Sequence, residues 1–188
     1  MSPVRPRHAA SLILLRREAG GTRVLMGRRP AKSRFAPDVF VFPGGRVDQA
    51  DFDRSVETAL AADCVRRTGA DPRLAAALAS AAIRETEEET GLVLAHDHGP
   101  LTLAARAITP TNSPVRFHAR FFAADAGLAS GQAADTSELA DLAWRTFDES
   151  LALPLFDITE AVLRTLKTDG SPFMMTYRAG TTLVRTLS

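Results

Sequence analysis

Four glutamates lie within a run of five residues, at positions 85, 87, 88 and 89, and Gly91 follows them. On a helix Glu85, Glu88 and Glu89 share one face, because they are three and four positions apart. Their mutual repulsion and the helix dipole both oppose such a cluster. Mg2+ or Mn2+ would neutralise it, and Mg2+ usually brings a phosphate-bearing substrate. Alone, the run is more typical of a solvated acidic face, so the rest of the chain must decide.

The surrounding residues predict the helix that carries these acids. Asp71 precedes Pro72, a pattern typical of an N-cap and first turn, and the following segment 74–83 is rich in Ala and Leu. Gly91 stands where a C-cap glycine is expected. We therefore expect a helix from about Pro72 to Thr90.

A second segment upstream, Phe42-Pro43-Gly44-Gly45 followed by Asp48 and Asp51, completes a pattern. The pattern is a glycine, five residues, an acid, a spacer, and then Arg-Glu-x-x-Glu-Glu-x-Gly. It resembles the signature of the Nudix hydrolases, matched here by Gly45, Asp51, Arg84, Glu85, Glu88, Glu89 and Gly91.

Three positions depart from the family pattern. Asp51 stands where the family usually has Glu, and Thr86 stands where it usually has an aliphatic residue. The spacer, residues 52–83, is far longer than usual. In this it resembles the branch that includes peroxisomal-type coenzyme A diphosphatases. We expect the inserted segment to be helical and to pack beside the active site as part of a substrate wall, or alternatively to form a dimer contact.

The resemblance implies an α+β fold, a Nudix-type α/β/α sandwich with a mixed sheet and a helical insertion at about 52–83. It implies that Mg2+ (or Mn2+) is bound by the Gly45 carbonyl and by Glu85, Glu88 and Glu89. Glu88 or Glu85 would accept a proton from water, and Arg84 would orient the carboxylates. Many members place another acid outside the motif; Glu138 is the candidate here, ahead of Asp135 and Asp141, although each could be a plain surface acid.

Several cations are candidates for holding substrate phosphates. Arg28 and Arg34 belong to a basic segment before the Phe-Pro-Gly-Gly motif, and Arg46 follows its glycines. Arg116 and His118 fall on one face of a strand predicted at 116–124, because Phe117, Ala119 and Phe121 alternate with them. A solvated basic loop and an exposed sheet face are the alternatives.

The composition bounds the remaining interpretation. The 188 residues suit one domain, 1–188, and the net charge of +1 argues against a chain built to bind nucleic acid. Cys64 is the only cysteine, which fits a cytoplasmic protein. No apolar run is long enough to span a membrane. Charged residues directly follow the apolar run 9–15, so a first strand explains it better than a signal peptide.

Hydrophobic patterns predict the other elements. Strands are expected at 9–15, 23–28, 39–42, 92–95, 101–108, 116–124 and 139–147, helices at 53–68 and 157–167, and a polar turn at 96–100. The segment 168–188 is either a terminal hairpin or an arm that contacts another subunit in a homodimer.

The function expected is Mg2+-dependent hydrolysis of a nucleoside diphosphate linked to another group, with coenzyme A or an acyl derivative as the leading substrate. ADP-ribose, dinucleotides and nucleoside triphosphates stay open. Two other classes are a non-catalytic Nudix module that senses ligands or binds proteins, and a nucleic-acid-binding protein built on the basic segment 28–34. Retention of all three acids of the motif favours the enzyme.

Overall fold

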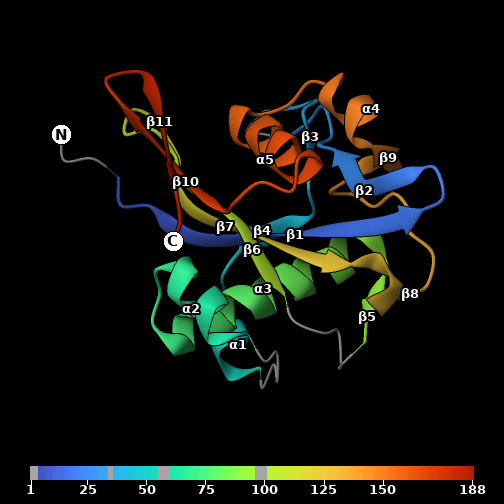
Figure 1. The fold of residues 1–188 in the computed structure, drawn as a ribbon, viewed down its shortest axis with the longest axis horizontal. Coiled ribbons are helices and arrows are strands. Elements are labelled where there is room, and N and C mark those ends of the chain that lie inside the picture. Colours follow the sequence, from blue (N-terminus) through green and yellow to red (C-terminus); the bar gives the residue numbers. More distant parts are fainter. Residues whose placement is uncertain (1–3, 34–35, 55–59, 96–100) are drawn as a thin grey trace.

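A mixed β-sheet lies between two helical layers (Figure 1). The structure is a computed structural model that describes residues 4–33, 36–54, 60–95 and 101–188. Within these residues the main sheet has nine strands, β1 (Arg7–Glu18), β2 (Gly21–Arg28), β3 (Phe40–Val41), β4 (Gly44–Arg46), β6 (Thr102–Ile108), β7 (Phe117–Asp125), β9 (Ala140–Thr146), β10 (Phe173–Arg178) and β11 (Thr181–Thr186). A separate pair is formed by β5 (Val93–Leu94) and β8 (Ala129–Ser130).

The strand order is β11-β10-β6-β7-β1-β2-β3, with β4 also paired to β1 and β9 to β2. The pairs β1–β7 and β6–β10 are parallel, and the other pairs of the main sheet are antiparallel. The predicted α+β class with a mixed sheet is therefore confirmed.

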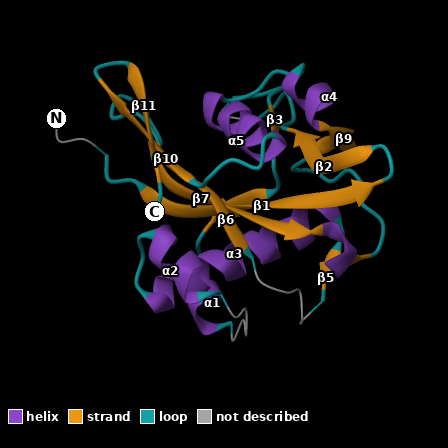
Figure 2. Ribbon diagram, in the orientation of Figure 1, coloured by secondary structure: helices purple, strands orange, loops and turns teal. Residues whose placement is uncertain are grey.

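Each face of the sheet has its own helices (Figure 2). One face is covered by α1 (Gln49–Asp53), α2 (Ala62–Thr68) and α3 (Pro72–Thr90), and the other by α4 (Phe147–Leu151) and α5 (Asp157–Lys167). The short 3-10 helix η1 (Ala126–Leu128) precedes β8. Alternation along β1 builds both cores: Leu12 and Leu14 belong to the core under α3, and Ile13 belongs to the core under α5.

The helix that carries the acids begins and ends where the sequence predicts. The Asp71 carboxylate accepts a hydrogen bond from the Leu74 N–H at 2.9 Å, and Pro72 lies in the first turn. Gly91 closes the helix in the left-handed conformation with a φ of 72°. These local caps fix the end of α3 independently of the chain before it.

The helix predicted over 53–68 is wrong in its extent. Arg54 has extended backbone and Ala61 has a non-helical ψ of 142°, so α1 ends at Asp53 and α2 begins at Ala62. The reason lies upstream, where Asp48 and Asp51 form a capping box that starts α1 at Gln49. Part of that expected helix, residues 55–59, and the turn predicted at 96–100 lie outside the described residues.

The C-terminal segment forms the hairpin β10–β11, with β10 docked parallel to β6 and β11 at the edge of the sheet. None of the helices in the described part of the chain is long and apolar enough to cross a bilayer.

Candidate active site

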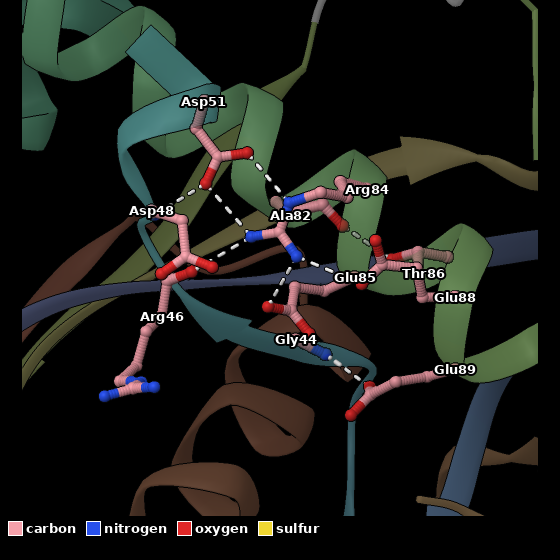
Figure 3. Close-up of polar contacts among 10 residues, drawn as sticks. All are labelled: Gly44, Arg46, Asp48, Asp51, Ala82, Arg84, Glu85, Thr86, Glu88 and Glu89. Atoms are coloured by element: carbon pink, nitrogen blue, oxygen red, sulfur yellow. Dashed lines mark hydrogen bonds and ion pairs between the residues drawn. The ribbon is translucent and has the colours of Figure 1, made fainter.

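The C-terminal half of α3 faces β4 (Figure 3). The Gly44 N–H donates a hydrogen bond to Glu89 Oε2 at 2.8 Å. The Glu85 carboxylate lies so close to Gly45 that a Cβ there would be 2.3 Å from Glu85 Cδ. Gly44, with a φ of 156°, leaves no more room, since its Cβ would lie 2.5 Å from the Ala10 carbonyl oxygen. Gly45 therefore permits the close approach of β4 to α3, and Gly44 permits the close approach of β4 to β1.

Arg84 joins the two halves of the motif. Its Nε and Nη2 bind the two carboxylate oxygens of Asp51 at 2.9 and 3.0 Å. Its Nη1 donates to Glu85 at 2.9 Å and to Glu88 at 3.0 Å, and Nη2 also reaches the Arg46 carbonyl oxygen at 3.1 Å. One guanidinium thus fixes the acidic helix against both α1 and β4.

Asp51 is the buried partner in this network. Its side chain is 0% exposed, and besides Arg84 it accepts a hydrogen bond from the Asp48 N–H at 2.8 Å. Hydrogen bonding to Asp51 is the main cause of a raised Arg84 pKa. The shorter side chain at this position is sufficient, because α1 places Asp51 directly beside the guanidinium (Figure 3).

The carboxylates of α3 form a partly buried cluster of negative charge. Burial raises the pKa of Glu85, and Arg84 offsets part of this rise. Burial also raises the pKa of Glu89 to about 8; the Gly44 N–H opposes the rise, and the negative charges of Glu85 and Glu138 add to it. These carboxylates are therefore poorly compensated by protein groups alone.

The Glu138 segment is fastened to the end of α3. Thr136 Oγ1 donates to the Glu89 carbonyl oxygen at 3.1 Å and accepts from the Glu138 N–H at 3.2 Å. The other two acids considered have different partners: Asp135 accepts hydrogen bonds from the backbone of β9, and Asp141 pairs with an arginine of β2. Of the three, Glu138 is the one whose charge acts on both Glu85 and Glu89.

The donor set has the chemistry of a divalent-cation site. Glu85, Glu88 and Glu89 supply hard oxygen ligands beside the Gly45 backbone, and burial raises the pKa of the carboxyls at positions 85 and 89. In the part of the chain that is described, no three His, Cys, Asp or Glu side chains are already arranged around a metal position. Instead, Arg84 donates hydrogen bonds to Glu85 and Glu88, and the Gly44 N–H donates one to Glu89.

A cavity of about 500 Å³ opens beside β4 on the α5 face of the sheet. Gly44, Gly45 and Arg46 form one side of it, next to the acids of α3. Its walls are mostly apolar and include four aromatic rings, from Phe117, Phe121, Phe156 and Tyr177. Among the described residues of the segment 52–83, namely 52–54 and 60–83, none lines the cavity.

The cations predicted to bind substrate phosphates lie in different environments in the structure. Arg46 lines the cavity. Arg28 is not among its lining residues and instead binds two aspartates, at 2.7 and 2.8 Å. Arg116 is 8% exposed and donates to two backbone carbonyls, so the expectation that it faces the substrate is corrected. Arg34 lies outside the described residues.

His118 lies on the face of β7 that α2 covers, away from the cavity, which corrects both the substrate-facing and the exposed-sheet interpretations. The C-terminal carbonyls of α2 account for this: Arg120 Nε donates to the Thr68 carbonyl at 3.2 Å, and Arg106 Nη1 donates to the Arg67 carbonyl at 3.4 Å. Arg106 also lies 3.4 Å from His118 Nε2. Burial, and then the neighbouring arginines, lower the pKa of His118 to about 3.

Sequence reasoning missed several residues of the cavity. Phe156 and Asp157 come from the start of α5, Tyr177 comes from β10, and Arg29 follows β2. Arg29 belonged to the basic segment already noted. No local pattern marks Tyr177, because β10 reaches the cavity only through its pairing with β6.

The sandwich fold and an acidic helix set against a glycine strand agree with the comparison with known families, which assigns a pyrophosphohydrolase. The chain matches the family model described as NUDIX domain over residues 6–166, and it belongs to this family. A comparison with curated proteins finds no match.

Solved structures agree with this assignment. A NUDIX hydrolase from Alicyclobacillus acidocaldarius shares 26% identity, with a TM-score of 0.67 over 87% of this chain and 91% of that one. A MutT NUDIX hydrolase from Burkholderia pseudomallei shares 22% identity, with a TM-score of 0.56 over 86% and 98%. The NUDIX domain of Shewanella oneidensis NrtR, complexed with ADP ribose, shares 12% identity, with a TM-score of 0.59 over 88% and 89%.

Proposed function

We propose that this enzyme hydrolyses a nucleoside diphosphate linked to another group and depends on Mg2+ (or Mn2+) to do so. The observation that carries the proposal is the set of carboxylates on α3, which lie between the guanidinium of Arg84 and the glycines of β4. The adjacent cavity, large enough for a nucleoside, supports a substrate with an organic group beside its phosphates.

Glu85, Glu88, Glu89 and the Gly45 carbonyl would hold the ion. When bound there, Mg2+ supplies charge neutralisation for the diphosphate and lowers the pKa of a coordinated water. Arg84 keeps the carboxylates aligned through its bonds to Glu85 and Glu88.

The proton of the attacking water goes to Glu88 or Glu85. The Glu88 side chain is 57% exposed and the Glu85 side chain is 16% exposed, so water reaches Glu88 more easily. Glu138 is the further acid of the site, since its charge reaches Glu85 and Glu89 across the Thr136 contact. Arg46, on the rim of the cavity, binds a phosphate oxygen of the substrate.

Among possible substrates, coenzyme A or an acyl derivative is the first to test, because the long spacer resembles that branch of the family. The ADP ribose bound by the NrtR domain of similar fold supports nucleoside diphosphates as a class. Products separate the candidates: coenzyme A yields phosphopantetheine and an adenosine bisphosphate, whereas a nucleoside triphosphate yields pyrophosphate.

The test is a panel of diphosphates incubated with and without Mg2+, with products identified by mass spectrometry. We expect turnover only with the metal, and a loss of about a hundredfold or more in Glu85→Gln and Glu88→Gln. Glu87→Gln is the matched control, because Glu87 lies on the same helix but accepts its hydrogen bond from the Leu94 N–H. Unchanged turnover in both active-site variants, with the fold intact by circular dichroism, would refute the assigned roles.

A further inference from the structure

Arg28 is the last residue of β2, and it joins two loops that flank the acids of α3. Its Nη1 donates a hydrogen bond to Asp38 Oδ1 at 2.7 Å, and its Nε donates to Asp141 Oδ2 at 2.8 Å. Asp38 precedes β3 and Asp141 lies in β9, and both strands pair with β2 (Figure 1). One guanidinium therefore fixes the spacing between the segments that lead into these two strands.

Both aspartates have a backbone conformation that costs free energy. Asp38 has a φ of 58° and Asp141 a φ of 50°, in the left-handed region that residues other than glycine rarely adopt. Asp141 also lies at a β-bulge, because the register between β9 and β2 shifts between Met26 and Arg28. Aspartate tolerates the left-handed conformation better than most residues. The two strained positions thus share one contact, the guanidinium of Arg28.

The first of the two loops carries Glu138 and is fastened at both ends. Thr136 ties one end to the last turn of α3 through its hydroxyl. At the other end, the Asp135 carboxylate accepts hydrogen bonds from the N–H groups of Asp141 and of the next residue, at 3.0 and 2.8 Å. The Asp141 side chain is in turn held by Arg28. The position of Glu138 therefore depends on Arg28 as well as on α3.

The second loop carries Arg29. The Asp38 N–H donates to the Arg29 carbonyl oxygen at 3.0 Å, so this loop closes directly beside the ion pair of Asp38 with Arg28. Arg29 lines the cavity. Burial raises the pKa of Glu89; Glu138 adds to the rise and Arg29 opposes it. The two loops thus bring charges of opposite sign to the same carboxylate.

We propose that Arg28 is a positioning residue that holds Glu138 beside the acids of α3 and Arg29 at the cavity. This inference rests on the proposed function, in which Glu138 is the further acid of the site. Arg28 acts through the two aspartates, which belong to the loops that it fixes. This role replaces the phosphate-binding role expected from its place in the basic segment.

The effect of Arg28 is local. Its ion pairs lie at the surface, and exposed ion pairs add little to global stability. Arg28→Met should therefore leave the Tm within about 2 °C of the wild type, while the two loops open more often.

Hydrogen exchange of the metal-free protein tests the positioning without any turnover. The amides of Asp38, Glu138 and Asp141 form hydrogen bonds within the two loops. In Arg28→Met they should exchange about tenfold faster, because opening no longer breaks the ion pairs. Arg28→Lys should give a smaller increase, since an ammonium keeps the charge but lacks the planar fork that reaches both aspartates.

Arg23→Met is the matched control. Arg23 lies on the same strand and also binds two carboxylates, Glu18 at 3.0 Å and Glu149 at 3.5 Å. Its side chain is 36% exposed, against 31% for Arg28. Arg23 pairs with Thr146, at the end of β9 that lies farther from the Glu138 loop. Its replacement should leave exchange in the two loops unchanged.

A double-mutant cycle separates positioning from a purely structural role. Mn2+ binding is measured by calorimetry for the wild type, Arg28→Met, Glu138→Gln and the double variant. Each single change should weaken binding about fivefold, and the double variant should also lose about fivefold, instead of the roughly twenty-five-fold that independent effects give. This result is expected because Arg28 acts through Glu138, so its effect disappears once that carboxylate is gone.

Unchanged exchange at Asp38 and Asp141 in Arg28→Met overturns the inference, and so does full additivity in the cycle. Failure of the proposed function gives a different result. A wild type that hydrolyses no diphosphate would refute that function, whereas exchange in the metal-free protein would still decide whether Arg28 holds the two loops.

Discussion

Replacing Glu89 by Gln should stabilise the metal-free protein at alkaline pH while abolishing hydrolysis. Glu89 is 8% exposed, and burial raises its pKa from 4.5 to about 8. A carboxyl group whose folded-state pKa is raised contributes stability below its unfolded pKa. That contribution is lost as the pH rises from about 4.5 through about 8, because the unfolded chain releases the proton first. Gln carries no charge at any pH and still offers the Gly44 N–H an oxygen.

The size of the effect follows from the shift. At about 1.4 kcal/mol per pH unit between the two pKa values, the upper limit is on the order of 5 kcal/mol. Local relaxation and water entry reduce the cost of a buried charge, so we expect about 2 kcal/mol at pH 9. For a chain of this length that corresponds to a rise of roughly 4–8 °C in Tm.

The assay is thermal unfolding in a chelator from pH 4 to pH 9, for the wild type, Glu89→Gln and the control Glu87→Gln. The wild type and Glu89→Gln should melt together at pH 4 and separate above about pH 5. Mg2+ should raise the Tm of the wild type at pH 8 and leave Glu89→Gln nearly unchanged. Coincident melting at pH 9, or a gap of the same size at pH 4, would show that Glu89 carries no buried-charge cost.

Three further substitutions test the framework around the acids. Asp51→Asn removes the charge that faces Arg84 and should cost about 3–5 kcal/mol in urea unfolding, with a parallel loss of turnover. Arg120→Met releases the Thr68 carbonyl at the end of α2, so amide hydrogens of 62–69 should exchange faster while kcat and KM stay unchanged. Gly45→Ala places a Cβ 2.3 Å from the nearest glutamate carboxyl carbon and should reduce turnover about a hundredfold, measured on the best substrate of the panel.

Features set by local chemistry could be predicted from the sequence. The bounds of α3 follow from Asp71, Pro72 and Gly91, which act on their own neighbours. The bounds of α5, Asp157–Lys167, follow from one amphipathic period. The alternation in the strand predicted at 116–124 correctly placed His118 and Arg120 on one face, because strand periodicity is local, whereas Arg116 lies before β7 and binds backbone carbonyls.

The element that packs against a given face of a strand could not be predicted in the same way. The basic face of β7 is buried because the carbonyls of α2 accept from Arg106 and Arg120 across long sequence separations. The alternation left two interpretations open, a face toward the substrate or a face toward solvent, whereas in the structure α2 covers the face. Tyr177 is a similar case, since only the pairing of β10 with β6 brings it to the cavity.

The network also explains how the motif tolerates its long spacer. The chemistry requires that Asp51 and Arg84 meet, and each is positioned by its own helix cap, through the capping box of α1 and the N-cap of α3. Lengthening the chain between two fixed ends costs only about 0.6 kcal/mol per doubling. That is small beside the two hydrogen bonds of a buried, charged pair, whose disruption costs about 3–5 kcal/mol. The spacing between the halves of the motif is therefore free to grow, provided that the acid at one end still meets the arginine at the other.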